Sequence, residues 1–308
     1  MKPRLIFIVG PTASGKTAVA LALAPRLKAE IISCDSMQVY RGMDILTSKP
    51  AENQLKKVAH HCLGIVSPGK EFNVSLYRAR AMRCVNGLLK RGTTPLFAGG
   101  TGLYVSVVVD GIFRRRTEDA VFRLRLMRLG KSKVSAFLHE RLAIVDPRAA
   151  GRIHPNDLKR IARALEVHKT TGKTISELQS SRKGLWDKFD IRIFCLEPER
   201  AALYARIDGR VDRMLRGGLV EEVRGLLKKK LSRTAGLAIG IREIKGYLRG
   251  EHSLELAVEM MKRNTRRYAK RQLTWFRRDT RVEWIKAGKR ATPAKLAALI
   301  EKKIRKGR

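Results

Sequence analysis

The sequence predicts an α/β protein in which a parallel sheet with flanking helices is interrupted by an all-helical insertion. Short apolar runs alternate with helical segments, which is the pattern of such a sheet. A glycine-rich turn joins the first apolar run to a helix. Between residues 110 and 188 the strand pattern stops and basic amphipathic segments replace it. A chain of 308 residues with 44% hydrophobic content can bury a core of this size.

The glycine-rich turn reads GPTASGKT at residues 10–17, between the apolar run 5–9 and a helical segment at 18–27. This is a phosphate-binding loop (P-loop), in which backbone N–H groups surround a phosphate cluster. Lys16 adds a positive charge, and the Thr17 hydroxyl can reach a magnesium ion. We therefore expect a P-loop NTPase-like core with Mg²⁺ as cofactor. The predicted phosphate-binding residues are Gly10, Thr12, Ala13, Ser14, Gly15, Lys16 and Thr17.

A second short strand at residues 30–34 leads directly to Asp35 and Ser36. Because the carboxyl ends of parallel strands open onto the same crevice, Asp35 should lie close to whatever the P-loop binds. The alternative is that Asp35 only caps the following turn. The shared crevice favours a chemical role.

The third strand, at residues 94–98, follows a predicted helix at 76–90 and ends in the sequence GGTG. Many phosphate-loop hydrolases carry an acid at the end of a central strand, where it holds magnesium and water. This chain has Ala98 and then glycine, which argues against an ATPase. We expect the glycines to let a substrate pass close to the backbone.

The expected domains are a core at residues 1–109 and 189–308 and a helical insertion at 110–188. Helices are predicted at 121–129 and 134–145, and a third should start at Asn156 or Asp157. Lys159, Arg160 and Arg163 lie on one edge of this third helix. They could grip a phosphate backbone or form an ordinary solvated face.

The chain returns to the sheet with a strand at residues 191–196, followed by a helical region at 206–230 and a turn at 236–242. Bases recur at four-residue spacing between 262 and 271, which predicts a broad positive stripe on one helix. Trp275 and Phe276 follow it. They could stack on bases, but we favour buried anchors for this helix. The end, 301–308, is expected to be a frayed basic helix.

Charge is the strongest bulk signal. Lys and Arg number 66 against 28 Asp and Glu, for a formal net charge of +38. Such a chain repels itself unless a polyanion lies nearby, so nucleic acid is the expected partner. A basic surface adapted to an unusual cytoplasm is the alternative.

Composition also bounds location and metal content. No apolar run is long enough to span a bilayer, and we expect a soluble, cytoplasmic protein. Four widely spaced cysteines predict reduced thiols rather than a structural zinc site. The run at 60–62, His-His-Cys, has no second cluster to complete a tetrahedral site.

Five motifs together resemble the tRNA dimethylallyltransferase family, in family order from about residue 5 to residue 278. They are GPTASGKT at 10–17, DSMQVY at 35–40, GGTGLY at 99–104, IHPND with the following RALE at 153–166, and KRQLTWF at 270–276. Because no cysteine/histidine finger follows the core, the resemblance is to the bacterial type.

The resemblance implies transfer of a dimethylallyl group from dimethylallyl diphosphate to N6 of the adenosine 3′ of the anticodon in tRNA, with diphosphate as the leaving group. It implies Asp35 as the base, Thr101 at the target nucleotide, Lys16 and the loop amides at the diphosphate with Mg²⁺ assisting, and Arg210 at the diphosphate as well. The implied partners are dimethylallyl diphosphate and the tRNA anticodon stem-loop, bound by a monomer. The implied tRNA-binding residues are Asp35, Ser36, Met37, Gln38, Thr101, Lys159, Arg160, Ile161, Ala162, Arg163 and Arg242.

The chain departs from the family pattern at a few positions. Leu46 stands where family members usually have glycine, before Thr-Ala-Lys-Pro, and we expect this change to alter the loop after Asp35. Gly64 and Ser67 replace common acidic residues, and Ile241 replaces a frequent aromatic. None of these removes a proposed catalytic group.

Three other functions remain open at this point. A kinase could use Asp35 to activate a hydroxyl, although the basic segments argue against it. A non-catalytic RNA-binding protein would not need Lys16, Thr17, Asp35 and Thr101 intact. An adenylate isopentenyltransferase, which acts on free nucleotide, would not need the basic segments.

Overall fold

The computed structural model describes residues 2–113, 119–129, 134–288 and 291–306. These residues form a parallel six-stranded sheet in the order β3-β2-β4-β1-β5-β6. The predicted parallel α/β fold is therefore confirmed. The strands are β1 (Arg4–Val9), β2 (Ala29–Ser33), β3 (His60–His61), β4 (Thr94–Gly99), β5 (Asp190–Pro198) and β6 (Val282–Ala287).

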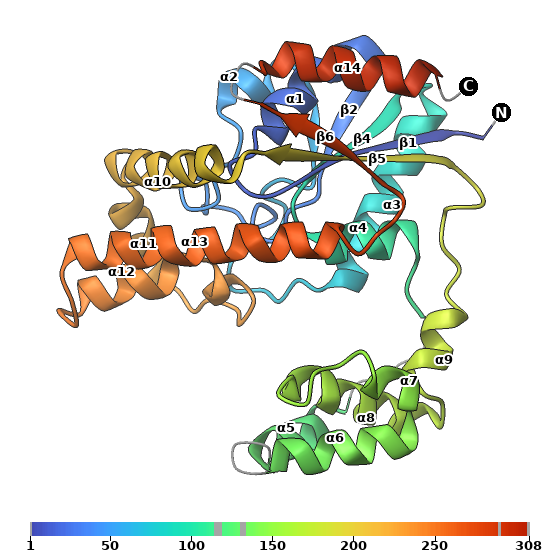
Figure 1. Ribbon diagram of the computed structural model, residues 1–308. Helices are drawn as coiled ribbons and strands as arrows, with labels where there is room; N and C mark the ends of the chain where they lie inside the picture. Colours follow the sequence, from blue (N-terminus) through green and yellow to red (C-terminus); the bar gives the residue numbers. More distant parts are fainter. Residues whose placement is uncertain (1, 114–118, 130–133, 289–290, 307–308) are drawn as a thin grey trace. The chain divides into compact units, whose positions relative to one another are not determined.

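The central strands are apolar on both faces because helices cover both. Five residues of β1, Leu5 to Val9, are at most 1% exposed. Helices α1 (Lys16–Leu23) and α14 (Pro293–Lys306) lie on one face, whereas α3 (Val74–Lys90) and α4 (Gly102–Val109) lie on the other (Figure 1). The P-loop, Asp35 and Thr101 follow β1, β2 and β4, so they lie at the same edge of the sheet.

Two compact units make up the chain. The core unit contains residues up to Val109 and from Leu185 onward, and the helical unit spans Asp110–Gly184. Leu185, which we had expected within the insertion, already belongs to the core, because its N–H donates to Val109 O at 2.7 Å.

The helical unit has its own small core. It contains α5 (Ala120–Leu129), α6 (Val134–Val145), α7 (Pro147–Ala150), α8 (Leu158–Thr171) and α9 (Ile175–Ser180). Leu142, Ile161 and Ala162 are fully buried in it. Asp157 rather than Asn156 caps α8, because its Oδ1 accepts from Arg160 N at 3.2 Å.

The C-terminal half adds α10 (Arg200–Arg216), α11 (Leu219–Leu227), α12 (Ile241–Leu248) and α13 (Leu254–Phe276), with the short α2 (Glu52–Leu55) earlier in the chain. The single helical region predicted at 206–230 is two helices. They separate at Gly218, whose φ of 92° ends one helix and begins the next.

Strands β3 and β6 were not predicted from the sequence, and the C-terminal helix differs from its prediction. The helix predicted as frayed at 301–308 begins at Pro293 and is docked, with Leu296, Ile300 and Ile304 buried against α1 and the sheet. Residues 307–308 lie outside the described residues. No helix in the described part of the chain is long and apolar enough to cross a membrane.

Candidate active site

The P-loop between β1 and α1 adopts backbone angles that require its glycines. Gly10 has a φ of 143° and Gly15 a φ of 89°, both in the region that favours glycine. A Cβ on Gly10 would lie 3.0 Å from Leu196 O, so β5 also restricts this position. Gly15 is the N-cap of α1, which places the positive end of that helix at the loop.

Lys16 is partly buried at the loop. Its Nζ donates to Pro11 O at 2.9 Å. Burial lowers the pKa of Lys16 to about 8, with Asp35 nearby opposing the shift and Arg210 adding to it. An anion bound in the loop would therefore stabilise the charged form of Lys16.

Ser14 is an unsatisfied donor in the same loop. Its side chain is 2% exposed, and its Oγ has no hydrogen-bond partner among the described residues. A buried hydroxyl without a partner costs free energy, which a phosphate oxygen in the loop would recover.

Arg210 on α10 connects the P-loop to a second loop. Its Nη1 donates to Thr12 Oγ1 at 3.1 Å, and its Nε donates to Ser48 Oγ at 2.8 Å. Its Nη2 donates to Thr47 O at 3.3 Å. Burial lowers the pKa of Arg210. The three bonds fix the guanidinium beside the P-loop.

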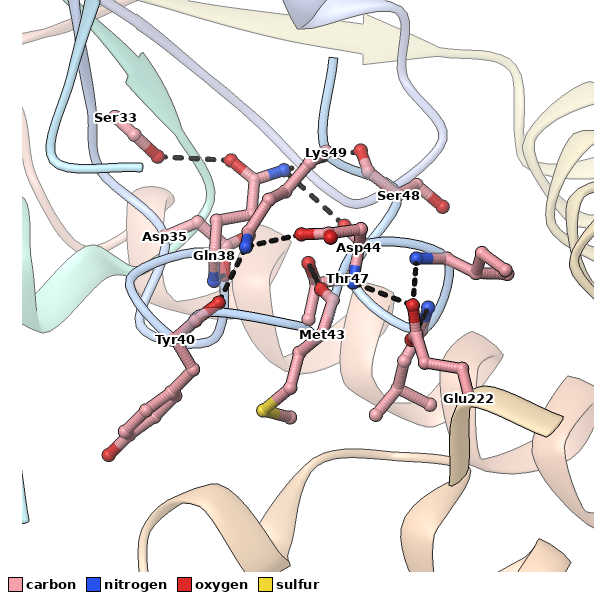
Figure 2. Close-up of polar contacts among 12 residues, drawn as sticks. Ser33, Asp35, Gln38, Tyr40, Met43, Asp44, Thr47, Ser48, Lys49 and Glu222 are labelled. Carbon is pink, nitrogen blue, oxygen red and sulfur yellow. Dashed lines mark hydrogen bonds and ion pairs between the residues drawn. The ribbon is translucent and has the colours of Figure 1, made fainter. Parts of the chain in front are cut away.

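The loop at residues 43–49, which follows Asp35, is held from several sides (Figure 2). Lys49 Nζ donates to Asp44 Oδ1 at 2.6 Å, and the Thr47 hydroxyl donates to Met43 O. Gln38 Nε2 reaches Thr47 O at 3.3 Å. Ser48 has a φ of 46°, which is unusual for a residue with a side chain. Arg210 and these contacts together hold that conformation.

Asp35 follows β2 and combines the two roles that the sequence left open. Its Oδ1 accepts from Met37 N at 2.9 Å and from Gln38 N at 3.4 Å, which is the geometry of a turn cap. The residue also lines a cavity together with Thr12 and Arg210. Capping is thus observed, and the side chain still faces the space beside the P-loop.

Thr101 lies at the end of β4 and contacts the same segment. Its Oγ1 accepts from Ser36 N at 3.0 Å, and Tyr268 on α13 borders a cavity that Ser36 also borders. Burial raises the pKa of Tyr268 well above its usual value.

The glycines around Thr101 do not leave room for a substrate, contrary to our expectation. A Cβ on Gly99 would overlap the Cys34 backbone, one on Gly100 the Gln272 amide, and one on Gly102 the Trp275 indole. The space beside each glycine is filled by protein. Trp275 packs on Gly102 while 39% exposed, and Phe276 is buried at 2%.

Two cavities meet at Arg210. The first, of about 1110 Å³, is bordered by the end of the P-loop and by Lys16, Lys49, Arg206, Arg210 and Arg213. The second, of about 250 Å³, is bordered by polar residues, among them Thr12, Asp35, Tyr268 and Arg210, and by apolar residues. The apolar residues are Met37, Leu46, Val211, Met214, Leu237, Ala238, Ile239 and Met261. We call the two spaces the cationic cavity and the apolar cavity.

The predicted positive stripe on α13 is partly used within the protein. Lys262 Nζ lies 2.8 Å from Asp212 Oδ1, and Arg266 Nη1 lies 2.5 Å from Asp208 Oδ1. Both acids are on α10. These two cations therefore join α10 to α13 instead of facing a ligand.

The basic helix α8 offers only part of its predicted tRNA-binding set to solvent. Lys159 and Arg160 are exposed, whereas Arg163 Nη1 pairs with the fully buried Glu166 at 2.8 Å. Ile161 and Ala162 are 0% exposed in the core of the helical unit. A contact from this segment would therefore come from Lys159 and Arg160. Arg242 is exposed on the first turn of α12.

The metal expected from the motif has one protein donor in this site. Thr17 borders the cationic cavity beside Lys16. Among the described residues no three His, Cys, Asp or Glu side chains are grouped so that they could hold a metal, and this includes the His-His-Cys run at 60–62. A magnesium ion here would need ligands from a bound diphosphate, a mode that suits this cation.

Two residues that build the site had no role predicted from the sequence. Gln272 on α13 accepts from Thr12 N and donates to Gly100 O, both at 2.8 Å, so it ties the P-loop to the end of β4. Glu222 on α11 accepts from three consecutive amides of the loop at 43–49. Gln272 stands in the KRQLTWF motif at 270–276, which was its one signal, whereas nothing in the sequence pointed to Glu222.

Comparison with protein families gives two matches. The IPP transferase family matches residues 38–279, and the isopentenyl transferase family matches residues 3–64.

Individual relatives agree. A protein of Carboxydothermus hydrogenoformans named tRNA dimethylallyltransferase is 45% identical over 291 residues, 94% of each chain. One of Moorella thermoacetica with the same name is 48% identical, covering 92% of this chain and 90% of its own.

Solved structures resemble the chain over its whole length. The tRNA isopentenylpyrophosphate transferase of Bacillus halodurans has a TM-score of 0.73 at 38% identity, with 99% of this chain and 98% of that chain covered. A eukaryotic dimethylallyltransferase described as acting on tRNA has a TM-score of 0.82 at 28% identity, with coverage of 99% and 80%.

Proposed function

The chain belongs to the family of the tRNA dimethylallyltransferases, which are prenyltransferases, and from this premise we propose that it transfers a dimethylallyl group from dimethylallyl diphosphate to N6 of the adenosine 3′ of the anticodon in tRNA. The observation that carries the proposal is the meeting of a cationic and an apolar cavity at Arg210, beside Asp35. Dimethylallyl diphosphate likewise joins an anionic diphosphate to an apolar allylic group, so each cavity matches one part of the donor.

The diphosphate would lie in the cationic cavity. Lys16, Arg210 and the N-terminus of α1 supply positive charge there, and the unpartnered Ser14 hydroxyl supplies a donor. As the bond between the allylic carbon and oxygen breaks, negative charge grows on the diphosphate. Donors already fixed in place stabilise that charge without rearrangement.

The dimethylallyl group would lie in the apolar cavity, with its reactive carbon towards Asp35. The N6 lone pair forms the new bond to this carbon while the carbon–oxygen bond to diphosphate breaks. Asp35 accepts the N6 proton, so the products are N6-(dimethylallyl)adenosine and diphosphate. Tyr268 borders this cavity, and Thr101, which accepts from Ser36 N beside it, would meet the nucleotide.

Thr17 would hold a magnesium ion together with diphosphate oxygens, where the cation would add positive charge at the leaving group. No carboxylate of the chain is required for this, which fits a β4 that ends in glycine rather than in an acid.

The tRNA would be bound through its phosphates by the exposed cations, Lys159 and Arg160 on the helical unit and Arg242 on the core. The target base must leave its stack, at a cost on the order of a few kcal/mol. An anticodon loop is already partly unstacked, which lowers that cost. A tRNA substrate also implies a cytoplasmic location, and we expect the enzyme to act as a monomer.

The direct test is incubation of the purified protein with dimethylallyl diphosphate, Mg²⁺ and unmodified tRNA that carries adenosines in the anticodon loop. Digestion and mass spectrometry should detect N6-isopentenyladenosine. Parallel reactions with AMP, and with ATP and small acceptors, test the two alternative enzymes. Product on AMP alone, or ATP turnover without prenylation, would refute the proposal.

A further inference from the structure

The loop at residues 43–49 is held at both ends by two consecutive helices, α10 and α11. Glu222 on α11 accepts from amides at the start of the loop, and Arg210 on α10 donates to oxygen atoms at its end. Only residues 217–218 separate the two helices in the chain. The acid and the base that hold this loop therefore belong to neighbouring elements.

The carboxylate of Glu222 accepts three hydrogen bonds from consecutive backbone amides (Figure 2). One oxygen accepts from Asp44 N at 2.9 Å and from Ile45 N at 2.8 Å, and the other accepts from Leu46 N at 2.8 Å. Hydrogen bonds to a charged acceptor are the stronger kind. Glu222 therefore fixes the start of the loop relative to α11.

Hydrogen bonds within the loop connect its start to its end. Ser48 N donates to Ile45 O and Lys49 N donates to Asp44 O, both at 3.0 Å. Because these bonds span the loop, fixing its first amides also fixes the carbonyl group of Thr47, which lies between them and Ser48.

The Thr47 carbonyl is where the loop contacts Arg210. It accepts from Arg210 Nη2 at 3.3 Å, and Nη1 of the same guanidinium donates to Thr12 Oγ1 in the P-loop at 3.1 Å. Arg210 Nε donates to Ser48 Oγ at 2.8 Å. A continuous series of contacts thus leads from Glu222 through the loop to the guanidinium and the P-loop.

Charge makes this support necessary. Arg210 contributes to the lowered pKa of Lys16, so the two cations repel each other when no anion lies between them. Without acceptors on the loop, the guanidinium would turn away from Lys16. Binding of a diphosphate would then have to bring a long side chain back into one conformation, which weakens affinity.

We propose that Glu222 is a positioning residue for the diphosphate of the donor: by fixing the loop at 43–49 it keeps Arg210 in the place where the guanidinium contacts the diphosphate. This inference rests on the proposed function for the location of the diphosphate. Glu222 is not among the described residues that border the cationic or the apolar cavity, so it acts through Arg210 and not by contact with the donor.

The test measures the dissociation constant of inorganic diphosphate with Mg²⁺ by calorimetry, together with steady-state kinetics. Glu222→Gln keeps the shape of the side chain but replaces one acceptor oxygen with an NH2 group, which cannot accept from the loop amides. It should weaken diphosphate binding and lower kcat/KM for dimethylallyl diphosphate by about tenfold. The KM for tRNA should stay at the wild-type value.

Glu221→Gln is the matched control. This neighbouring glutamate is exposed, and its Oε1 lies 3.8 Å from Arg224 Nη1 on the same helix. The variant removes the same charge and should leave both constants unchanged. Loss of a negative charge by itself favours an anion, so weaker binding in Glu222→Gln alone cannot come from net charge.

A double-mutant cycle with Arg210→Ala separates positioning from general destabilisation. If Glu222 acts through Arg210, Glu222→Gln should change the dissociation constant of diphosphate by less than about twofold in the Arg210→Ala background. Melting temperatures are measured for all four proteins, and the constants are compared at a temperature at which all are folded. An equal loss in both backgrounds, or an unchanged constant in Glu222→Gln, would overturn the inference.

The two readouts also distinguish this inference from the proposed function. If wild type transfers no dimethylallyl group to tRNA, the proposed function fails, and the diphosphate constants still decide whether Glu222 acts through Arg210. If wild type binds no inorganic diphosphate, the diphosphate site and the role of Glu222 are both wrong.

Discussion

The backbone N–H of Thr12 donates to the side-chain oxygen of Gln272 at 2.8 Å, and this bond anchors the P-loop to the C-terminal part of α13. The side-chain Nε2 of Gln272 in turn donates to Gly100 O, and Gln272 is only 5% exposed. A single buried side chain on α13 therefore holds the P-loop and the end of β4 at fixed distances from that helix.

Replacing Gln272 should destabilise the core and weaken donor binding together. Gln272→Leu leaves the Thr12 N–H and the Gly100 carbonyl without partners, at about 1–3 kcal/mol for each buried group. Urea denaturation measures the free energy of unfolding, and the KM for dimethylallyl diphosphate reports how well the P-loop binds the donor. Thr274→Val, two residues along the helix, loses only a bond to its own helix and should change neither. Normal stability in Gln272→Leu would show that the bridge is not needed.

Asp35→Asn should separate proton transfer from local structure. An asparagine keeps an Oδ1 that can accept from Met37 N and Gln38 N, so the turn after β2 should persist. It cannot act as a base, and kcat should fall by about 10²–10⁴. Single-turnover kinetics and tRNA binding by filter retention measure the two effects. A variant that keeps its rate but loses tRNA affinity would remove Asp35 from the base role.

The pKa of Lys16, lowered by burial to about 8, predicts how donor binding depends on pH. Below that pKa the ammonium is charged and attracts the diphosphate, whereas above it the free enzyme presents a neutral amine. Consequently kcat/KM for dimethylallyl diphosphate should decline as pH rises through about 8, because this parameter reports the free enzyme.

Lys16→Arg keeps its charge over this range and should lose the decline at whatever rate it retains. A wild-type profile that stays flat up to pH 9.5 would contradict the assignment.

Salt dependence should identify the cations that contact tRNA. The double variant Lys159→Ala with Arg160→Ala removes two exposed charges of α8, and the slope of log affinity against log salt should become shallower by about one for each lost phosphate contact. Lys173→Ala removes an exposed charge beyond the end of the same helix and serves as the matched control. Equal slopes for all three proteins would mean that α8 does not contact the RNA.

The parts of the site that follow from local sequence were predictable. The motif GPTASGKT identifies the P-loop by its spacing, and a strand that leads to Asp35 in a parallel sheet places that residue beside the loop. These two patterns predicted that Asp35 lies close to the P-loop, and Asp35 and Thr12 do line one cavity. The family resemblance, now confirmed by the comparisons, rests on the same kind of local pattern.

The remaining parts depend on side chains that meet from distant positions. In the sequence Glu222 is an ordinary glutamate of an amphipathic helix. Neither its helix nor the loop at 43–49 carries a pattern that predicts their contact. The glycines at 99–102 indicated close approach correctly, but not that Gln272 and Trp275 would be the groups approaching. In the same way, Lys262 and Arg266 resembled part of a ligand-binding stripe. Their ion-pair partners, Asp212 and Asp208, lie on another helix and could not be assigned from the sequence.

The docking of α14 on α1 has a consequence for synthesis on the ribosome. The helix that leads out of the P-loop buries Val19 and Leu23 in a cluster that also contains Leu296 and Ile300. During translation that apolar surface stays uncovered until Pro293–Lys306 has emerged, long after the loop itself has been made. We therefore expect nascent chains of this protein to need protection from aggregation until Pro293–Lys306 has emerged.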